Sequence, residues 1–265
     1  MSSSRFTSHD IASALQWYVD IGWDEAILPD TQNRLAEKEL RIVENAPLSA
    51  VAVGDTHRVR DPLGAAEAKE SISALVAGVT SLEVLREVVM QFNGFAIRKT
   101  ATNMVFGDGN PAARLMVIGE VPDAEDDKIG RAFSGEAGQL LDKMMGAIGL
   151  SRSSVEVAQA VYLTQVLNWR PPGNRSPSVA EIALSLPFLE KHIELVAPEF
   201  ILLMGSVPAK ALLGVNESIT KLRGQWFEYK SIPCLVSYPP SFLLKSPAKK
   251  RESWEDLQAL QQKLG

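Results

Sequence analysis

Four segments of the chain hold the side chains that could do chemistry, and each follows an apolar run. They read GEVPDAEDDKIGRAFSG from residue 119, TQVLNWRPPGNRSP from 164, GSVPAK from 205 and SYPPSFLLK from 237. The first contains a group of carboxylates, Asp123, Glu125, Asp126 and Asp127. Such a group could bind a cation, because hard cations prefer carboxylate oxygens as ligands. A solvated acidic loop is the simpler interpretation.

The second and fourth segments suggest other chemistry. Arg170 and Arg175 could contact phosphate, and they could equally pair with the acidic first segment. Pro239 stands at the end of an apolar run, where α/β enzymes often place a working residue, yet it has no ionisable group. No histidine is placed to act there; the chain has three, His9, His57 and His192.

These segments must be positioned by the elements between them. Apolar runs typical of strands cover 113–122, 161–169, 199–205 and 232–239, and helical patterns cover 134–150, 178–196, 207–214 and 249–264. Strands rich in Val, Ile and Leu that alternate with helices predict an α/β fold, a three-layer sandwich with a central, mostly parallel sheet. Sites in such folds gather beyond the carboxyl ends of the strands. Neither G-x-G-x-x-G nor G-x-x-x-x-G-K-[ST] is present.

The region before residue 91 differs in character. A helix is predicted over 8–23, a mixed linker over 28–70 and one or two further helices over 71–92. We therefore divide the chain into an N-terminal helical extension, 1–90, and a main domain, 91–265. Residues 1–90 hold 14 acidic and 8 basic residues, so this extension could bind a protein partner.

Composition excludes several classes of protein. Of 265 residues, 46% are hydrophobic and 22% charged, as in ordinary soluble domains, and the net charge is −5. No apolar run is long enough to span a membrane, and the first residues lack a signal-peptide pattern. We expect a cytoplasmic monomer. The only cysteine, Cys234, excludes intramolecular disulfides and any all-thiolate metal site.

Taken together, the segments resemble the uracil-DNA glycosylase superfamily, specifically its family 4 enzymes. There the first segment reads roughly G-E-x-P-G, then acidic residues, then G-R-P-F-x-G-x-A-G-x-L-L; this chain has GEVPD and GRAFSGEAGQLL. The second reads T-N-x-x-x-x-R-P-P-x-N-R-x-P, against TQVLNWRPPGNRSP here, and the last H-P-x-x-L-L, against PPSFLL. Order, spacing and intervening elements match over about residues 92–260.

The resemblance implies hydrolysis of the N-glycosidic bond of uracil in DNA, after the base flips into a pocket. Phe133 would stack on the base, and Glu120 would lie in the water-activating motif, followed by Val121 and Pro122. Position 165 would read the base and position 239 would hold a donor to the leaving uracil. Residues implied to face the DNA are Arg170, Arg175, Leu243, Leu244 and Lys245, with the two leucines in a loop that enters the duplex.

Three positions depart from the family pattern. The donor histidine is Pro239, the base-reading asparagine is Gln165, and the closing glycine of the first motif is Asp123. Loss of one preorganised donor typically costs about 10²–10³ in rate. The longer glutamine would displace a bidentate contact, and a carboxylate at 123 is unfavourable beside an anionic leaving group. Efficient excision of uracil is therefore not expected.

The family also holds a 4Fe-4S cluster on four cysteines. The corresponding positions here are Phe92, Phe95, Trp169 and Ser185. An iron–sulfur cluster needs thiolate ligands, so we expect no such cofactor, and aromatic packing could fill the vacated volume.

Three functions remain open at this point. The first is a uracil-DNA glycosylase-like repair enzyme with reduced or altered activity, acting on uracil-containing or damaged DNA. The second is an inactive family member that still binds DNA. The third is a partner-binding protein whose old pocket is packed shut. An enzyme should keep an open pocket over Phe133, whereas a pure interaction protein should let Asp123 or Gln165 fill it.

Overall fold

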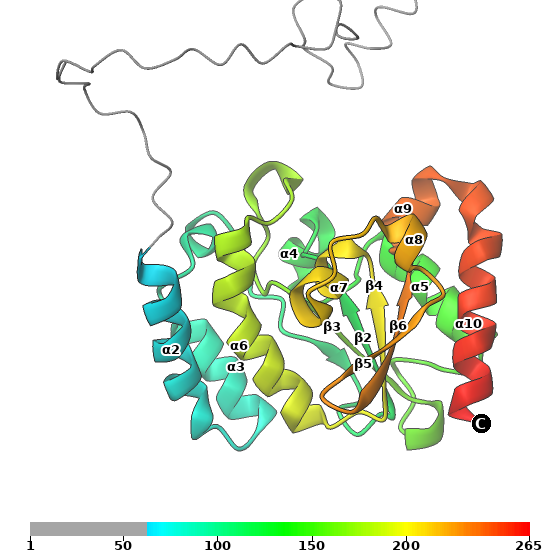
Figure 1. Ribbon diagram of the computed structural model, residues 1–265, viewed down its shortest axis with the longest axis horizontal. Helices are drawn as coiled ribbons and strands as arrows, with labels where there is room; N and C mark the ends of the chain where they lie inside the picture. The colour runs from blue at the N-terminus through cyan, green and yellow to red at the C-terminus, as the bar shows by residue number, and fades with distance from the viewer. Residues whose placement is uncertain (1–62) are drawn as a thin grey trace, which may run out of the picture. The chain divides into compact units, whose positions relative to one another are not determined.

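A computed structural model describes residues 63–265, with side chains described from residue 70 onward (Figure 1). Every described residue belongs to one compact unit, which spans residues 57–265. The helix predicted over 8–23, together with His9 and His57, lies outside the described residues. Within residues 63–265, every helix is too short or too polar to cross a membrane.

The helices are α2 (Leu63–Ala77), α3 (Leu82–Gln91), α4 (Ala124–Ile129), α5 (Glu136–Ala147), α6 (Val179–Val196), α7 (Ser206–Leu213), α8 (Ile219–Leu222), α9 (Pro240–Lys245) and α10 (Lys250–Leu264). The strands are β1 (Asp108–Gly109), β2 (Leu115–Gly119), β3 (Val161–Gln165), β4 (Phe200–Met204), β5 (Trp226–Tyr229) and β6 (Ile232–Ser237). Short 3-10 turns cover Ala96–Lys99, Val157–Gln159, Pro172–Asn174 and Pro247–Lys249.

The strands form one sheet in the order β1-β3-β2-β4-β6-β5. The four inner strands, β3, β2, β4 and β6, are parallel, and the edge strands β1 and β5 are antiparallel to their neighbours. The predicted central, mostly parallel sheet is thus confirmed. The two edge strands were not predicted, because β1 is only two residues long and β5 lacks a buried apolar run.

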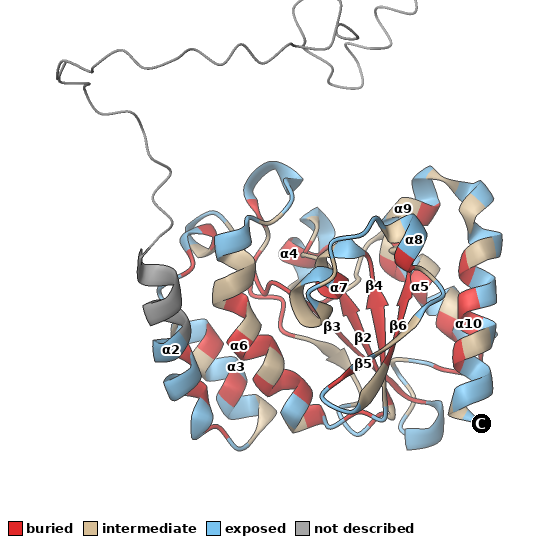
Figure 2. Ribbon diagram, viewed as in Figure 1, coloured by how far each residue is buried: buried red, intermediate tan, exposed pale blue. Residues whose placement is uncertain are grey.

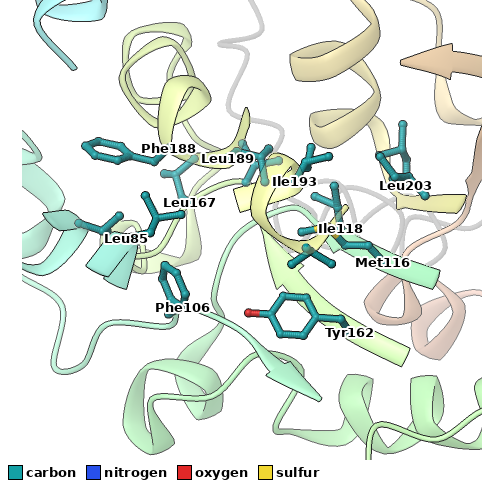
Figure 3. Packing of buried hydrophobic residues seen from close by; sticks show 14 of the residues in the cluster. Leu85, Phe106, Met116, Ile118, Tyr162, Leu167, Phe188, Leu189, Ile193 and Leu203 are labelled. Carbon is teal, nitrogen blue, oxygen red and sulfur yellow. The ribbon is translucent and has the colours of Figure 1, made fainter. Parts of the chain in front are cut away.

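Helices cover both faces of the sheet, and each face has its own hydrophobic cluster (Figure 1). On one face, alternate strand residues such as Met116, Ile118 and Leu203 pack beneath α6, α3 and α2 (Figure 3). On the other, the intervening residues such as Val117 and Leu202 pack against α5 and α10. Because both faces are covered, the inner strands are almost entirely buried (Figure 2). This arrangement confirms the three-layer fold.

The helices before residue 91 pack into the same core as the sheet. Ile72 in α2 and Leu85 in α3 are buried in the cluster that contains the β2 and β3 side chains. Residues 63–70, which the sequence assigned to a linker, form the first turns of α2. These two helices extend the α-layer that α6 begins.

One further difference concerns the segment after β6. The sequence placed Leu243 and Leu244 in a loop, but Pro240–Lys245 forms the short helix α9. Pro239 has an extended backbone at the start of the helix. Its carbonyl accepts hydrogen bonds from the N–H groups of Phe242 and Leu243. The two prolines that read as loop residues therefore begin a helix.

Candidate active site

A cavity of about 260 Å³ lies beyond the carboxyl ends of the parallel strands. Strand ends and the segments that follow them supply its wall, as expected for this fold. It brings together eight of the predicted site residues: Glu120, Val121, Pro122, Asp123, Phe133, Gln165, Pro239 and Lys245. The cavity is therefore the candidate active site.

Phe133 forms one wall of the cavity in a constrained conformation. Its φ is +53°, a left-handed value that a bulky residue rarely adopts. Its ring lies over Gly119 so closely that a Cβ on that glycine would be 2.5 Å from the ring's Cζ. Arg152 supports the turn, since its guanidinium donates to the carbonyls of Ala132 (2.9 Å) and Phe133 (3.1 Å).

Glu120 extends from the end of β2 toward the start of α7. Its Oε1 accepts a hydrogen bond from the Val207 N–H at 3.2 Å and one from the Ser206 hydroxyl at 3.5 Å. Burial raises the pKa of Glu120, and these hydrogen bonds only partly oppose that effect. A carboxylate held in this way can accept a proton from water at the cavity wall.

Gln165, at the end of β3, is held by the buried carboxylate of Asp126. Its Nε2 donates to Asp126 Oδ2 at 2.8 Å and to the Val121 carbonyl at 3.3 Å, while Oε1 has no partner. Asp126 is only 2% exposed, and its Oδ1 accepts the Ser134 N–H at 2.6 Å. Burial raises the pKa of Asp126.

Asp123 lines the cavity, and one oxygen of its carboxylate is engaged at the start of α4. Its Oδ1 accepts the N–H bonds of Glu125 and Asp126, each at 2.9 Å. Asp126 in turn accepts the Asp123 N–H, which completes a capping box. The carboxylate expected to oppose an anionic leaving group is thus engaged in capping a helix.

The four carboxylates of the first segment do not form a solvated loop, which corrects the simpler interpretation. They lie in and before α4, and Asp127 is buried, with its Oδ1 accepting the N–H bonds of Thr102 (2.8 Å) and Asn103 (3.1 Å). Among residues 63–265 no group of three or more His, Cys, Asp or Glu side chains is arranged to hold a metal ion. Asp126 and Asp127 instead tie segments of backbone together.

Pro239 borders the cavity without offering a donor, as the sequence indicated. Ser241 and Lys245, both exposed on α9, line the same wall. A second cavity, of about 270 Å³, adjoins this wall and is also lined by Glu120, Ser206 and Pro239. The position of the missing histidine therefore lines both cavities.

The structure separates the residues predicted to face DNA. Arg175 pairs with Glu181 at 2.6 Å, and Arg170 donates to Asn174 at 2.7 Å, so neither arginine pairs with the acidic first segment. Leu244 is 39% exposed on α9, but Leu243 is only 1% exposed. Such burial assigns Leu243 to packing beneath α9 and leaves Leu244 on the surface.

The four positions of the family's cluster ligands are filled by packing. The rings of Phe92 and Phe95 lie 5.3 Å apart, edge to face, and both pack on Phe188. The guanidinium of Arg98 lies 5.5 Å from the ring of Trp169. The Ser185 hydroxyl donates to the carbonyl of Val166. Two benzyl groups, an indole and a hydroxyl provide no thiolate, so these residues do not fit an iron–sulfur cluster.

Two other reactive side chains belong to the core. His192 accepts or donates a hydrogen bond with the Tyr162 hydroxyl at 2.9 Å and stacks on Phe106. Complete burial lowers the pKa of His192 to about 3, so it stays neutral. Cys234 is buried in β6, and burial raises the pKa of its thiol to about 12. Neither residue reaches the cavity.

Some cavity residues were missed by sequence reasoning. Asp126 was seen only as one of four acids, and its contact with Gln165 could not be read from a spacing of 39 residues. Ser206 follows a strand in the segment GSVPAK, which the sequence marked without assigning a residue. Asn174 and Ser241 lie in segments that were marked for other residues.

The sequence model of the Uracil DNA glycosylase superfamily matches residues 106–258. A Type-4 uracil-DNA glycosylase of Sulfurisphaera tokodaii is 35% identical over 69% of this chain and 84% of its own. The Type-4 uracil-DNA glycosylase of Thermotoga maritima is 34% identical over 62% of this chain and 84% of its own. The Type-4 uracil-DNA glycosylase of Archaeoglobus fulgidus is 30% identical over 67% of this chain and 90% of its own.

Proposed function

Because this chain belongs to the uracil DNA glycosylase superfamily, we propose that it is a uracil-DNA glycosylase-like protein of DNA base-excision repair. It would hydrolyse the N-glycosidic bond of uracil in DNA, with reduced or altered activity. The observation that carries the proposal is the open cavity over Phe133. Asp123 and Gln165, the two side chains that could fill it, are both held by α4 and its neighbours.

The cavity suits a flipped base. Phe133 offers an aromatic face, and stacking on aromatic side chains contributes about 1–3 kcal/mol per base. A cavity of about 260 Å³ is small, which favours one base over a larger ligand. The alternative of a pocket packed shut, as in a pure partner-binding protein, has less support from this geometry.

The proposed reaction uses Glu120 to position the attacking water. As the glycosidic bond breaks, its electron pair leaves with uracil and the sugar becomes oxocarbenium-like. Water then adds to the sugar carbon and passes a proton to a base, and the half-buried carboxylate of Glu120 at the cavity wall serves as that base. The developing charge on uracil meets no side-chain donor at Pro239, so we expect a rate about 10²–10³ below that of a site with this donor.

A catalytically inactive member that still binds DNA is the second candidate. It is favoured by the absence of a donor at Pro239, together with the Gln165 amide N–H bonds being used within the protein. Leu244, Lys245 and Arg170 would then contact DNA. A protein partner of the acidic region 1–90 remains a prediction about residues that lie mostly outside the described part.

We further propose that the protein works without a 4Fe-4S cluster. Its single cysteine, Cys234, is buried in β6, away from Phe92, Phe95, Trp169 and Ser185. Incubation with an iron chelator should leave both the midpoint of thermal unfolding and any DNA binding unchanged. A fall in either would contradict this proposal.

Single-turnover excision from a uracil-containing oligonucleotide tests the activity. Wild type is compared with Glu120→Ala, Pro239→His and the triple variant that adds Gln165→Asn and Asp123→Gly. Pro239→Ala is the matched control, because it restores a backbone N–H without a side-chain donor. Cleavage by wild type well above that of Glu120→Ala supports an active enzyme.

Restoration of cleavage only in the histidine-containing variants would support the inactive, DNA-binding alternative. If every variant is silent and none binds DNA, the glycosylase proposal is wrong.

A further inference from the structure

Four residues line both cavities beyond the strand ends and therefore mark the boundary between them: Glu120, Pro239, Ser241 and Lys245. In the proposed reaction Glu120 positions the water that attacks C1′ of the sugar, so C1′ lies at this boundary. Lys245 is the one amine among the four residues. A sugar that has lost its base would thus face both a carboxylate and a lysine side chain.

Lys245 is free to act at this boundary. It stands in the last turn of α9, the helix that follows β6 at the edge of the sheet where the parallel strands end (Figure 1). Lys245 is exposed, and within residues 63–265 it has no ion-pair partner, whereas Lys249 pairs with Glu252 at 2.6 Å. Because a lysine amine sits on a flexible four-carbon stem, Lys245 can reach into the space that it lines.

Glu120 is engaged from the side of α7. Its Oε1 accepts the Val207 N–H at 3.2 Å, and the described part of the chain gives it no lysine or arginine partner. The carboxylate and the Lys245 amine therefore border the same cavities without neutralising each other. An amine can form an imine with a carbonyl carbon, and a carboxylate can remove a proton from the neighbouring carbon. Together these two groups can carry out an elimination.

We propose that Lys245 and Glu120 give this site a second activity, that of an abasic-site lyase in which Lys245 forms a covalent imine with the sugar. The inference rests on the proposed function for the position of the sugar beside Glu120. The substrate is the ring-opened aldehyde form of an abasic site, which is what excision of a base leaves in DNA. An abasic site from any other source has the same chemistry.

The step balances without an added oxidant or reductant. The unprotonated Nζ of Lys245 adds to the C1′ aldehyde, and the aldehyde oxygen leaves as water, which gives a protonated imine. Glu120 takes a proton from C2′, and the electron pair of that C–H bond forms a C2′–C3′ double bond. The C3′–O bond breaks, and its electron pair leaves with the 3′ phosphate. Water then hydrolyses the imine, so one strand ends in an unsaturated aldehyde and the other in a 5′-phosphate.

Trapping of the imine tests the proposal. The full chain is incubated with an oligonucleotide that already carries one abasic site, and sodium cyanoborohydride reduces the imine to a stable amine. A covalent complex should form with wild type, and peptide mapping should place the link on Lys245. Lys245→Arg keeps the positive charge that could contact phosphate but offers no amine, so trapping should fall at least about tenfold.

Lys250→Arg is the matched control, because Lys250 is also exposed, at the start of α10, and lines neither of the two cavities. It should trap as wild type does. Fluorescence anisotropy with an oligonucleotide that carries a tetrahydrofuran in place of the abasic sugar should show equal binding by both variants. Loss of trapping in Lys245→Arg is then a loss of the amine and not of DNA binding.

The role of Glu120 is tested by strand cleavage. Removal of a general base slows proton transfer, so Glu120→Gln should slow cleavage of the abasic oligonucleotide at least about tenfold more than it lowers trapping. Equal losses in cleavage and trapping would show that Glu120 does not take the C2′ proton.

The lyase is separable from the proposed function, because the abasic site is supplied ready-made. No trapping by wild type, trapping that persists in Lys245→Arg, or a link spread over several lysines would overturn the lyase and leave the proposed excision standing. Trapping on Lys245 without any excision of uracil by wild type would support the lyase and overturn the proposed excision.

Discussion

Glu120 Oε1 accepts the backbone N–H of Val207 at 3.2 Å, which joins the end of β2 to the first turn of α7. The contact depends on Gly205, whose φ of +116° and ψ of 176° are accessible essentially only to glycine. A Cβ at Gly205 would lie 2.5 Å from Oε1 of Glu120. The position of the Glu120 carboxylate, which is proposed to bind water, therefore depends on Gly205, the residue that follows β4.

Replacing Gly205 by alanine should displace Glu120 and strain the backbone at once. We expect Gly205→Ala to lower the free energy of unfolding by about 1–3 kcal/mol from backbone strain alone. The new methyl group would add to this loss. Urea denaturation measures the effect, and single-turnover excision reports any loss of activity.

Gly214→Ala serves as the control, because Gly214 also has a positive φ, +69°, but a Cβ there would meet nothing within 4 Å. Gly214→Ala should lower the free energy of unfolding by only about 1–2 kcal/mol and leave excision activity unchanged. Equal effects of the two substitutions on activity would contradict the link between Gly205 and Glu120.

Stability should depend on pH through Glu120. Burial raises its pKa in the folded protein above the usual value of 4.5, so the folded state holds the proton more tightly than the unfolded state. The stabilising effect is complete below pH 4.5 and is lost as pH rises through the folded-state pKa. Relative to Glu120→Gln, which does not titrate, wild type should become less stable over this range.

Urea denaturation of both proteins across this pH range measures the difference. Asp126 and Asp256 also have raised pKa values, but they are common to both proteins and largely cancel. A difference that stays constant with pH would show that Glu120 keeps its ordinary pKa.

Much of the layered fold was predictable because each inner strand is a continuous apolar run. The runs around Val117 and Leu202 read as buried strands, and both are strands covered on two faces. The helix α6 was predicted from its helical pattern over 178–196, and in the structure Ser178 and Glu181 form a capping box at its start. Local signals of this kind need no knowledge of distant contacts.

The orientation of the site residues was not predictable. Asp123 was expected beside the leaving group and it lines the cavity, but the sequence did not reveal that its Oδ1 also accepts the N–H groups of Glu125 and Asp126 in α4. The longer Gln165 was expected to displace a bidentate contact with the base, and nothing in the sequence indicated that its amide is bonded to Asp126, 39 residues away. Such choices depend on which partner lies nearby in the folded chain, and sequence spacing does not carry that information.

Arg152 should act as a positioning residue for Phe133. It lies beneath the turn, donates to the carbonyls of Ala132 and Phe133, and pairs with Asp108 at 2.9 Å. Lysine in Arg152→Lys cannot donate to both carbonyls as the guanidinium does, so the turn at Phe133 should loosen. Binding of a uracil-containing oligonucleotide should then weaken several-fold. Fluorescence anisotropy measures this binding, with a uracil-containing oligonucleotide whose 2′-fluorine protects the glycosidic bond.

Arg114→Lys is the matched control, because Arg114 also joins a carboxylate, Glu199, and a carbonyl, that of Leu264, away from the cavity. It should leave oligonucleotide binding unchanged. A similar loss in both variants would indicate a general effect of removing an arginine.

The aromatic packing at the family's cluster positions should contribute directly to stability. Phe95 is 2% exposed and contacts the rings of Phe92 and Phe188. Phe95→Ala removes a buried ring and should cost about 3–5 kcal/mol in the free energy of unfolding. Urea denaturation measures the loss, and Phe95→Leu, which keeps most of the volume, should cost clearly less. Equal losses in the two variants would argue against ring packing as the cause.

Asp123 gives the final prediction, because its helix-capping role and its place at the cavity can be separated. Asp123→Ala removes the cap of α4 and should lower the free energy of unfolding by about 0.5–2 kcal/mol. Asp123→Ser keeps a capping oxygen and should lower it much less. Both substitutions remove the negative charge. If that charge were set against an anionic leaving group, both would raise excision or uracil binding equally. Because Oδ1 of this carboxylate accepts the N–H groups of Glu125 and Asp126 in α4, we expect Asp123→Ser to match wild type in uracil binding. An increase would show that the charge acts on the cavity.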